Sequence, residues 1–160
     1  MKGLGILAPV SSTDIGQSKV ALFKLLDIYW SLLDTLGVCD FGYVPRGAGT
    51  LDELLGIIRS ATGWRTTWFE LMKLGERSIN MARVFNYREG FTSKDDNLPE
   101  VFFHNFKGGP LDGQGAINKE DFQKAIRLRY QLMGWDVNSG IPTRSKLIEL
   151  GFSWLVDEVK

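Results

Sequence analysis

The chain has 160 residues, of which 44% are hydrophobic, and it carries 19 basic and 19 acidic side chains with a formal net charge of zero. This length is sufficient for one sizeable hydrophobic core, so we expect residues 1–160 to form a single domain. Because neither charge is in excess, the composition argues against nucleic acid, an anionic membrane surface or a strongly charged substrate as a partner.

Cys39 is the only cysteine. A single cysteine excludes a disulfide within the chain and fits a reducing compartment, so we expect a cytoplasmic protein. No apolar stretch approaches the roughly 20 residues that a membrane-spanning helix needs. A membrane location is therefore not expected.

The first predicted element is a helix over residues 17–36. Its content of Leu, Phe, Tyr and Trp is so high that we expect it to be buried on most sides, and it should end at Gly37. A second helix is predicted to begin after Thr50, because Thr50 and Glu53 have the spacing of a capping box. This helix should end near Gly63.

Thr67 and Glu70 repeat the capping-box spacing and predict a third helix that runs to about Arg88. Gly75 marks a point where this helix could be irregular. Residues 90–115 are then rich in glycine, proline and aspartate, which predicts a surface loop with at most a short helix at 100–103. We expect this loop to be ordered, with apolar anchors at Phe91, Val101, Phe102, Phe103 and Phe106.

The last third of the chain carries two more helix starts. Asn118 should cap a helix that runs to about Met133, and Thr143 should open a short helix. Residues 152–156 are apolar and should dock as a final turn. Since no stretch alternates apolar and polar residues long enough for a strand, the predicted fold class is all-α. We expect an irregular multi-helix domain with long ordered loops.

The residues with the clearest chemical potential surround the end of the first helix. Asp34 lies in the last predicted turn, where the helix macrodipole disfavours a carboxylate. A salt bridge to a nearby Arg or Lys is the explanation that the residues alone favour, and a functional role is the alternative. After Gly37, Val38, Cys39 and Asp40 begin a glycine-rich turn of the kind that lets backbone amides approach a ligand.

Cys39 has two interpretations from the residues alone. A free cysteine is commonly a small buried apolar residue. It can also be the ligand of a metal or cluster whose other ligands lie on another part of a larger polypeptide.

Residues 34–39, DTLGVC, resemble the pterin-binding motif of the tungsten-containing aldehyde:ferredoxin oxidoreductase family, which reads Asp, two spacers, Gly, Leu, then Cys or Asp. Val38 stands where the family usually has Leu. Residues 75–103 are similar to the family's pattern of a helix that passes into an Asn-x-Arg-Glu-Gly turn, paired Asp and Leu-Pro. Residues 134–151 resemble its terminal stretch, so the resemblance covers roughly residues 33–152.

This resemblance implies the C-terminal helical domain of an enzyme that oxidises an aldehyde with water to a carboxylate. In the family, electrons pass from a tungsten or molybdenum pterin through a 4Fe-4S cluster to ferredoxin. By resemblance, Asp34 accepts hydrogen bonds from pterin nitrogens, Gly37, Val38 and Asp40 belong to the same cofactor-binding turn, and Cys39 is one metal ligand of the cluster.

The family's N-terminal region carries the other three cluster cysteines and the residues that act on the aldehyde. We expect that region as a partner, because this sequence lacks it. The isolated chain should therefore hold no iron or tungsten, should not be catalytic, and should self-associate through apolar surface near residues 34–41. The alternative is a stand-alone helical interaction domain that has lost cofactor binding.

Several other residues have structural interpretations that we prefer to functional ones. Asn86, Arg88 and Glu89 should fix the exit of the third helix rather than act as a base and an anion clamp. Paired acids at 95–96 are expected to form a turn rather than a metal site. His104 should be a partly buried packing residue. The tryptophans should form core, and this expectation covers Trp64, Trp68, Trp135 and Trp154.

Overall fold

The structure is a computed structural model that describes the chain except for residues 1–3, 5, 7, 44–46, 48 and 160. Its elements in chain order are α1 (Gln17–Leu36), α2 (Asp40–Tyr43), α3 (Leu51–Thr62), α4 (Trp68–Arg88), η2 (Glu100–Phe103), α5 (Lys119–Met133), α6 (Arg144–Glu149) and η3 (Ser153–Val159). In the part of the chain that is described, extended pairing is limited to an isolated bridge between Trp135 and Pro142. The predicted all-α fold class is confirmed.

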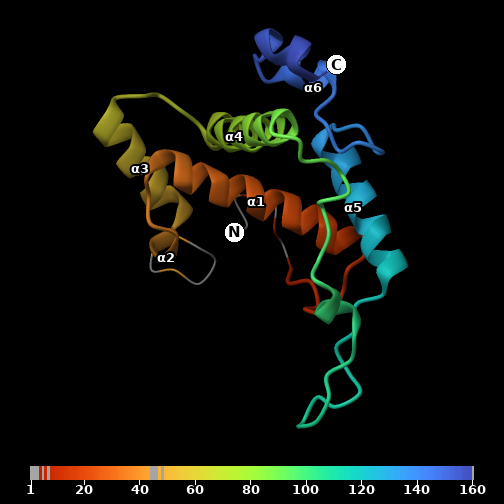
Figure 1. Cartoon of the computed structure of the whole chain (residues 1–160). Helices are drawn as coiled ribbons and strands as arrows, with labels where there is room; N and C mark the ends of the chain where they lie inside the picture. Colours follow the sequence, from red (N-terminus) through yellow and green to blue (C-terminus); the bar gives the residue numbers. More distant parts are fainter. Residues whose placement is uncertain (1–3, 5, 7, 44–46, 48, 160) are drawn as a thin grey trace.

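Two long helices, α1 and α4, form the centre of the fold, with α2 and α3 at one end and α5 at the other (Figure 1). The two helices pack closely at Gly75. A Cβ atom at this position would overlap the backbone carbonyl oxygen of Ile28 and would lie 3.1 Å from the Cβ of Leu32. Gly75 therefore permits close backbone packing, and α4 continues through it without the predicted irregularity.

The apolar core has three parts. The largest joins α1, α3 and α4 and contains Tyr29, Leu32 and Leu33, which are fully buried. A second part packs α6 and η3 against the end of α4. The third packs α5 and Trp135 on Ile28 of α1, and there the Trp135 indole donates a 2.8 Å hydrogen bond to the Asn80 side chain.

The expectation that the first helix is buried on most sides is wrong. Phe23 and Trp30 of α1 are 51% and 46% exposed. Because the described neighbours cover only part of the helix surface, an apolar composition does not by itself place every large side chain inside.

The predicted helix starts and ends are confirmed. Thr50 with Glu53 and Thr67 with Glu70 form complete capping boxes. The side chains of Asn118 and Thr143 cap α5 and α6. None of the helices in the described part is both long and apolar enough to cross a membrane.

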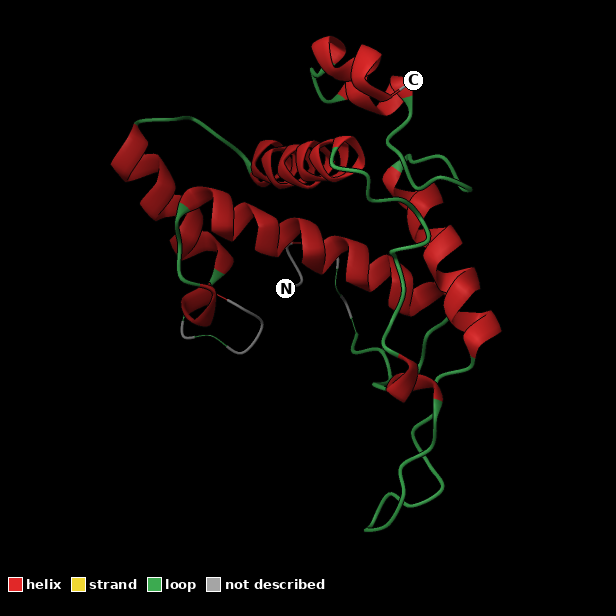
Figure 2. Ribbon diagram, viewed as in Figure 1, coloured by secondary structure: helices red, strands yellow, loops and turns green. Residues whose placement is uncertain are grey.

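The segment between η2 and α5 extends away from the helices as a long loop (Figure 2). The expected apolar anchors of residues 90–115 are mostly exposed, and this includes Phe102 and Phe106. Only Phe103 packs inward, with its ring centroid 5.7 Å from that of Phe122. Backbone bonds hold the loop instead, such as that from Phe106 N to Gln114 O at 2.8 Å.

Two further packing expectations are wrong. The His104 side chain is 66% exposed and lies 3.5 Å from a Glu100 oxygen. Trp64 and Trp154 are 56% and 67% exposed, whereas Trp135 lies in the core. Aromatic type alone did not distinguish the inward from the outward rings.

The exit of α4 is held by the residues that we expected to be structural there. The Arg88 guanidinium pairs with Glu158 of η3 at 3.3 Å. The Asn86 carbonyl accepts a 3.0 Å hydrogen bond from the Phe91 amide. These contacts connect the helix end to the C-terminal turn and to the following loop.

Candidate functional site

The turn after α1 is shaped by two backbone hydrogen bonds. Gly37 has a positive φ of 68°, and its amide donates to the carbonyl oxygen of Asp34 at 3.1 Å. The Val38 amide donates to the carbonyl oxygen of Leu33 at 3.0 Å. This pattern closes a helix and favours glycine at the left-handed position. It fixes where the chain leaves α1.

The DTLGVC segment has an anchored part and an exposed part. Leu36 and Val38 pack against the core formed by α1, α3 and α4. Asp34, Gly37 and Cys39 are exposed. The apolar side chains therefore hold the turn in place, while its carboxylate and thiol lie at the surface on either side of Gly37.

Asp34 has no ion pair or side-chain hydrogen bond with any other residue that the structure describes. Its neighbours line a groove of about 700 Å³ that runs along α1, α4 and α5. The salt bridge that the sequence favoured is not found within the described residues. The carboxylate oxygens are thus open to donors from outside this part of the chain.

Asp40 begins α2 and differs from Asp34 in its surroundings. Its Oδ1 atom is buried, and no donor among the described residues bonds it. The neighbouring Tyr29 hydroxyl donates to the carbonyl oxygen of Tyr43 at 2.7 Å. Burial, together with the negative charge of Asp40, raises the pKa of Tyr29. Tyr29 therefore stays protonated and ties α2 to α1.

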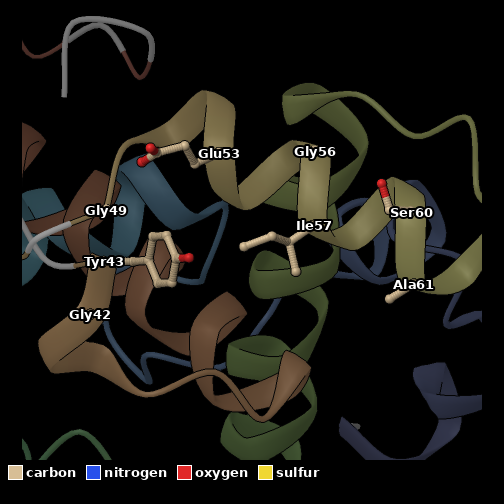
Figure 3. A pocket seen from close by; sticks show the side chains of 8 residues that line it. All are labelled: Gly42, Tyr43, Gly49, Glu53, Gly56, Ile57, Ser60 and Ala61. Atoms are coloured by element: carbon tan, nitrogen blue, oxygen red, sulfur yellow. The ribbon is translucent and has the colours of Figure 1, made fainter.

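A shallow groove of about 930 Å³ lies between α2 and α3 (Figure 3). The Tyr43 and Ile57 side chains point toward each other across it. Its other lining residues on α3 are mostly small, as at Gly56, Ser60 and Ala61. The one carboxylate there, on Glu53, is engaged by its capping partner Thr50. The groove therefore presents surface for packing rather than an acid or a base.

Sequence reasoning missed this groove and its two principal side chains. Phe41, beside it on α2, is 88% exposed. The signal was present in the glycines at 42, 47 and 49, which the sequence interpretation took as a ligand-approaching turn. Only the folded backbone places Tyr43 opposite the outer surface of α3.

Cys39 cannot form a metal site with other side chains that the structure describes. No group of three or more His, Cys, Asp and Glu side chains in those residues could hold a metal ion. The thiol is exposed, and a Cβ atom built on Gly37 would meet nothing within 4 Å. This arrangement fits one ligand of a shared cluster beside a bound cofactor, with the remaining ligands supplied from elsewhere.

The paired acids at 95 and 96 both accept hydrogen bonds from neighbouring residues. Asp95 accepts a 2.7 Å hydrogen bond from the Thr92 amide, as expected for a turn. Asp96 instead takes both terminal nitrogens of Arg83, at 2.9 and 2.5 Å, and the Tyr130 hydroxyl. Asp96 therefore joins the loop to α4 and α5, a role beyond the turn former that its sequence position suggests.

Comparison with known proteins identifies the family of this chain. The family model described as aldehyde ferredoxin oxidoreductase, domains 2 & 3, matches residues 2–152. The tungsten-containing aldehyde ferredoxin oxidoreductase of Pyrococcus furiosus is 31% identical over 152 residues, which are 94% of this chain and 24% of that protein. The enzyme of the same name from Thermococcus kodakarensis is 32% identical with the same coverage. The chain thus spans about a quarter of the length of these relatives.

A solved structure shares the fold. It is the active site complex BamBC of benzoyl coenzyme A reductase with 1,5-dienoyl-CoA, which superposes with a TM-score of 0.69 at 21% identity. The match covers 94% of this chain and 22% of that one. The family match and the identity to the two archaeal enzymes show that this chain belongs to the aldehyde ferredoxin oxidoreductase family, as a C-terminal domain.

Proposed function

We propose that this chain supplies part of the pterin site and one ligand of the 4Fe-4S cluster in an aldehyde:ferredoxin oxidoreductase. One observation carries the proposal. Asp34 and Cys39 are both exposed, on either side of Gly37, at a turn whose Leu36 and Val38 pack into the core. A rigid base with outward polar groups is what a cofactor-binding turn requires.

Asp34 would orient the pterin. An ionised carboxylate only accepts hydrogen bonds, so it suits the amino and ring N–H groups of a pterin. The position near the negative end of the α1 dipole makes an unpaired carboxylate unfavourable. Two donated hydrogen bonds from a ligand would offset that cost. No described side chain competes for the carboxylate.

Cys39 would bind one iron of the cluster as a thiolate. The Cys39 carbonyl accepts a 3.1 Å hydrogen bond from the Gly42 amide, which holds the thiol-bearing residue against the start of α2. When bound, the tungsten or molybdenum pterin and the cluster supply the redox chemistry, in which an aldehyde and water give a carboxylate and two electrons pass to ferredoxin. The chain's own contribution is positioning, and we assign no catalytic residue in it.

The remaining ligands would come from the N-terminal region of a larger enzyme. The relatives are about four times as long as the matched segment, which supports such a partner. We therefore propose that the isolated chain holds neither iron nor tungsten and does not oxidise aldehydes. Phe41, 88% exposed beside the turn, would then favour self-association.

A stand-alone helical interaction domain is the second candidate. The apolar groove between α2 and α3 favours it, since that groove offers packing surface without an acid or base. Under this alternative, Asp34 and Cys39 would be retained from an ancestral enzyme and would bind no cofactor. The same experiment distinguishes the two candidates.

The test grafts this chain onto the Pyrococcus furiosus enzyme in place of the segment that it matches. Grown with iron and tungsten, the chimera should contain both metals and show the visible absorbance of an iron–sulfur cluster. Cys39→Ala should lower the iron content and that absorbance, whereas Asp34→Asn should mainly lower the pterin content. Asp52→Asn, at an exposed carboxylate on α3 outside this turn, is the matched control and should change neither.

Unchanged iron content and absorbance in Cys39→Ala would refute the cluster-ligand role. If both variants matched the parent chimera, the interaction-domain alternative would stand. Aldehyde oxidation by the purified chain alone would contradict the proposed dependence on the N-terminal region.

A further inference from the structure

A groove separate from the cofactor turn lies between the first half of α1 and the first half of α4. Its volume is about 580 Å³, within the range of small-molecule sites. The wall is mainly apolar and includes Leu25, Trp68, Phe69 and Met72. Phe69 is 74% exposed, so the wall offers apolar surface that an occupant would cover. This is a candidate site for an apolar group.

Among the described residues, the lysines at and beside the groove outnumber the carboxylates that pair with them. Lys73 pairs with Glu76 and Glu149, and so does Lys146. Lys24, which also lines the groove, has no hydrogen bond or ion pair with any described residue. The carboxylates of Glu76 and Glu149 thus pair with Lys73 and Lys146, and no carboxylate among the described residues pairs with Lys24.

The surroundings of Lys24 make an anionic occupant favourable. Burial lowers the pKa of Lys24, and the nearby charges of Lys146 and Lys73 act in the same direction, whereas those of Glu76 and Glu149 act against it. A cation that has lost part of its hydration is stabilised by a counter-ion that enters with it. A singly charged carboxylate matches one unpaired ammonium, whereas the apolar wall matches a hydrocarbon body.

We propose that this groove binds a carboxylate with an apolar body, an alkyl or aryl acid. The carboxylate would accept a charge-assisted hydrogen bond from the Lys24 ammonium, and the hydrocarbon would lie against Phe69 and Met72. This site does not depend on the cofactor turn, because Lys24 precedes Asp34 by about 15 Å along α1 at the helical rise of 1.5 Å per residue.

The methionine methyl groups allow a direct test on the chain itself. Met72 lines the groove, whereas Met81 is 45% exposed farther along α4 and outside the groove lining, and Met133 is fully buried in the core cluster against which Met72 packs. With methyl-labelled methionine, octanoate below its micelle concentration should shift the Met72 signal in a saturable manner and leave the Met81 signal in place. Met72→Leu assigns the signal. Octanamide, which is neutral and of similar shape, should bind more weakly.

Variants at Lys24 test the charge. Lys24→Gln should weaken octanoate binding by about tenfold or more, as expected for a hydrogen bond between charged groups, and should barely affect octanamide. Lys24→Arg should retain octanoate binding. Lys19→Gln, on the same helix but outside the groove, is the matched control and should leave affinity unchanged.

Three outcomes would overturn this proposal. Equal affinity for octanoate and octanamide would show that the groove binds the hydrocarbon and does not recognise the charge. Octanoate affinity that is unaffected by Lys24→Gln would remove the assigned partner. If the Met72 signal shifted with protein concentration and did not change when octanoate was added, a second copy of the chain would occupy the groove.

Discussion

The hydroxyl of Tyr29 donates a 2.7 Å hydrogen bond to the backbone carbonyl of Tyr43, and this contact joins the middle of α1 to the end of α2. Tyr29 is fully buried, so its ring is held by the surrounding core. The four-residue helix between Asp40 and Tyr43 has little internal support of its own. The position of the turn after Cys39 therefore depends on a core residue that precedes it by ten positions.

Tyr29→Phe should remove that hydrogen bond and leave the Tyr43 carbonyl without its partner. We expect the free energy of unfolding to fall by about 1–2 kcal/mol, the usual cost of such a loss. Urea denaturation measures this change. Because α2 would be held less firmly, alkylation of the Cys39 thiol should also become faster. An unchanged unfolding free energy would show that α2 is fixed by other contacts.

Gly75→Ala and Gly56→Ala form a matched pair of helix substitutions. At Gly75 the added methyl would overlap the Ile28 carbonyl oxygen, so α1 and α4 would have to separate. We expect a loss of about 1–3 kcal/mol from overpacking, even though alanine favours a helix. At Gly56 a Cβ meets nothing within 4 Å, so alanine should stabilise α3 by about 0.5–1 kcal/mol. Thermal unfolding should show opposite shifts, and equal shifts would contradict the close packing at Gly75.

The sequence predicted helix boundaries well because their signals are local. Thr50 with Glu53 and Gly37 after α1 act within one helical turn, and both behave as their patterns indicate. The packing at Gly75 could not be read in the same way. A glycine inside a helix can indicate either an irregularity or a close contact with another helix. The sequence alone does not distinguish the two, because the answer depends on where the other helix lies.

The sequence located the segment that forms the candidate site, but it did not show which of its side chains are exposed. The resemblance located residues 34–40, and the structure adds that Leu36 and Val38 pack inward while Asp34 and Cys39 are exposed. The predictions that His104 and two of the tryptophans are buried were wrong, because burial depends on which elements cover a side chain. This chain spans about a quarter of the length of its relatives, and its apolar composition overestimates how many of its side chains are buried.

Acid should weaken the contact between α4 and α6. Hydrogen bonds from Lys146 and Lys73 lower the pKa of Glu149 from 4.5 to about 2. Burial alone would raise the pKa of Glu76, but hydrogen bonds from the same two lysines lower it. The folded state thus binds these protons less readily than the unfolded state. The stabilisation that these two carboxylates contribute should be fully present above pH 4.5 and should be lost as the pH falls toward 2.

Glu149→Gln should flatten this part of the stability curve. Since the Glu149 side chain is 46% exposed, the effect should be roughly 1 kcal/mol or less and should shrink in high salt. Urea denaturation at a series of acidic pH values measures it. A slope that is the same in the parent and in Glu149→Gln would exclude this carboxylate as the cause.

Alkali should act on a different contact, between Tyr130 and Asp96. Burial, together with the hydrogen bond that its hydroxyl donates to Asp96, raises the pKa of Tyr130 to about 12. Because the unfolded chain releases this proton near pH 10, the stabilisation is present below pH 10 and is lost as the pH rises toward 12. The absorbance of tyrosinate should therefore show at least one group that ionises late.

Asp96→Asn should lower the pKa of Tyr130, although burial still raises it, and should loosen the loop at the same time. The substitution replaces the carboxylate that Arg83 binds through two nitrogens at 2.9 and 2.5 Å. Since the Arg83 side chain is only 13% exposed, leaving it without a counter-ion should cost about 2 kcal/mol or more. Asp95→Asn is the matched control, because among the described residues the Asp95 side chain is hydrogen-bonded only to Thr92. If both variants lowered the pKa of Tyr130 equally, loop order rather than the Asp96 carboxylate would set that pKa.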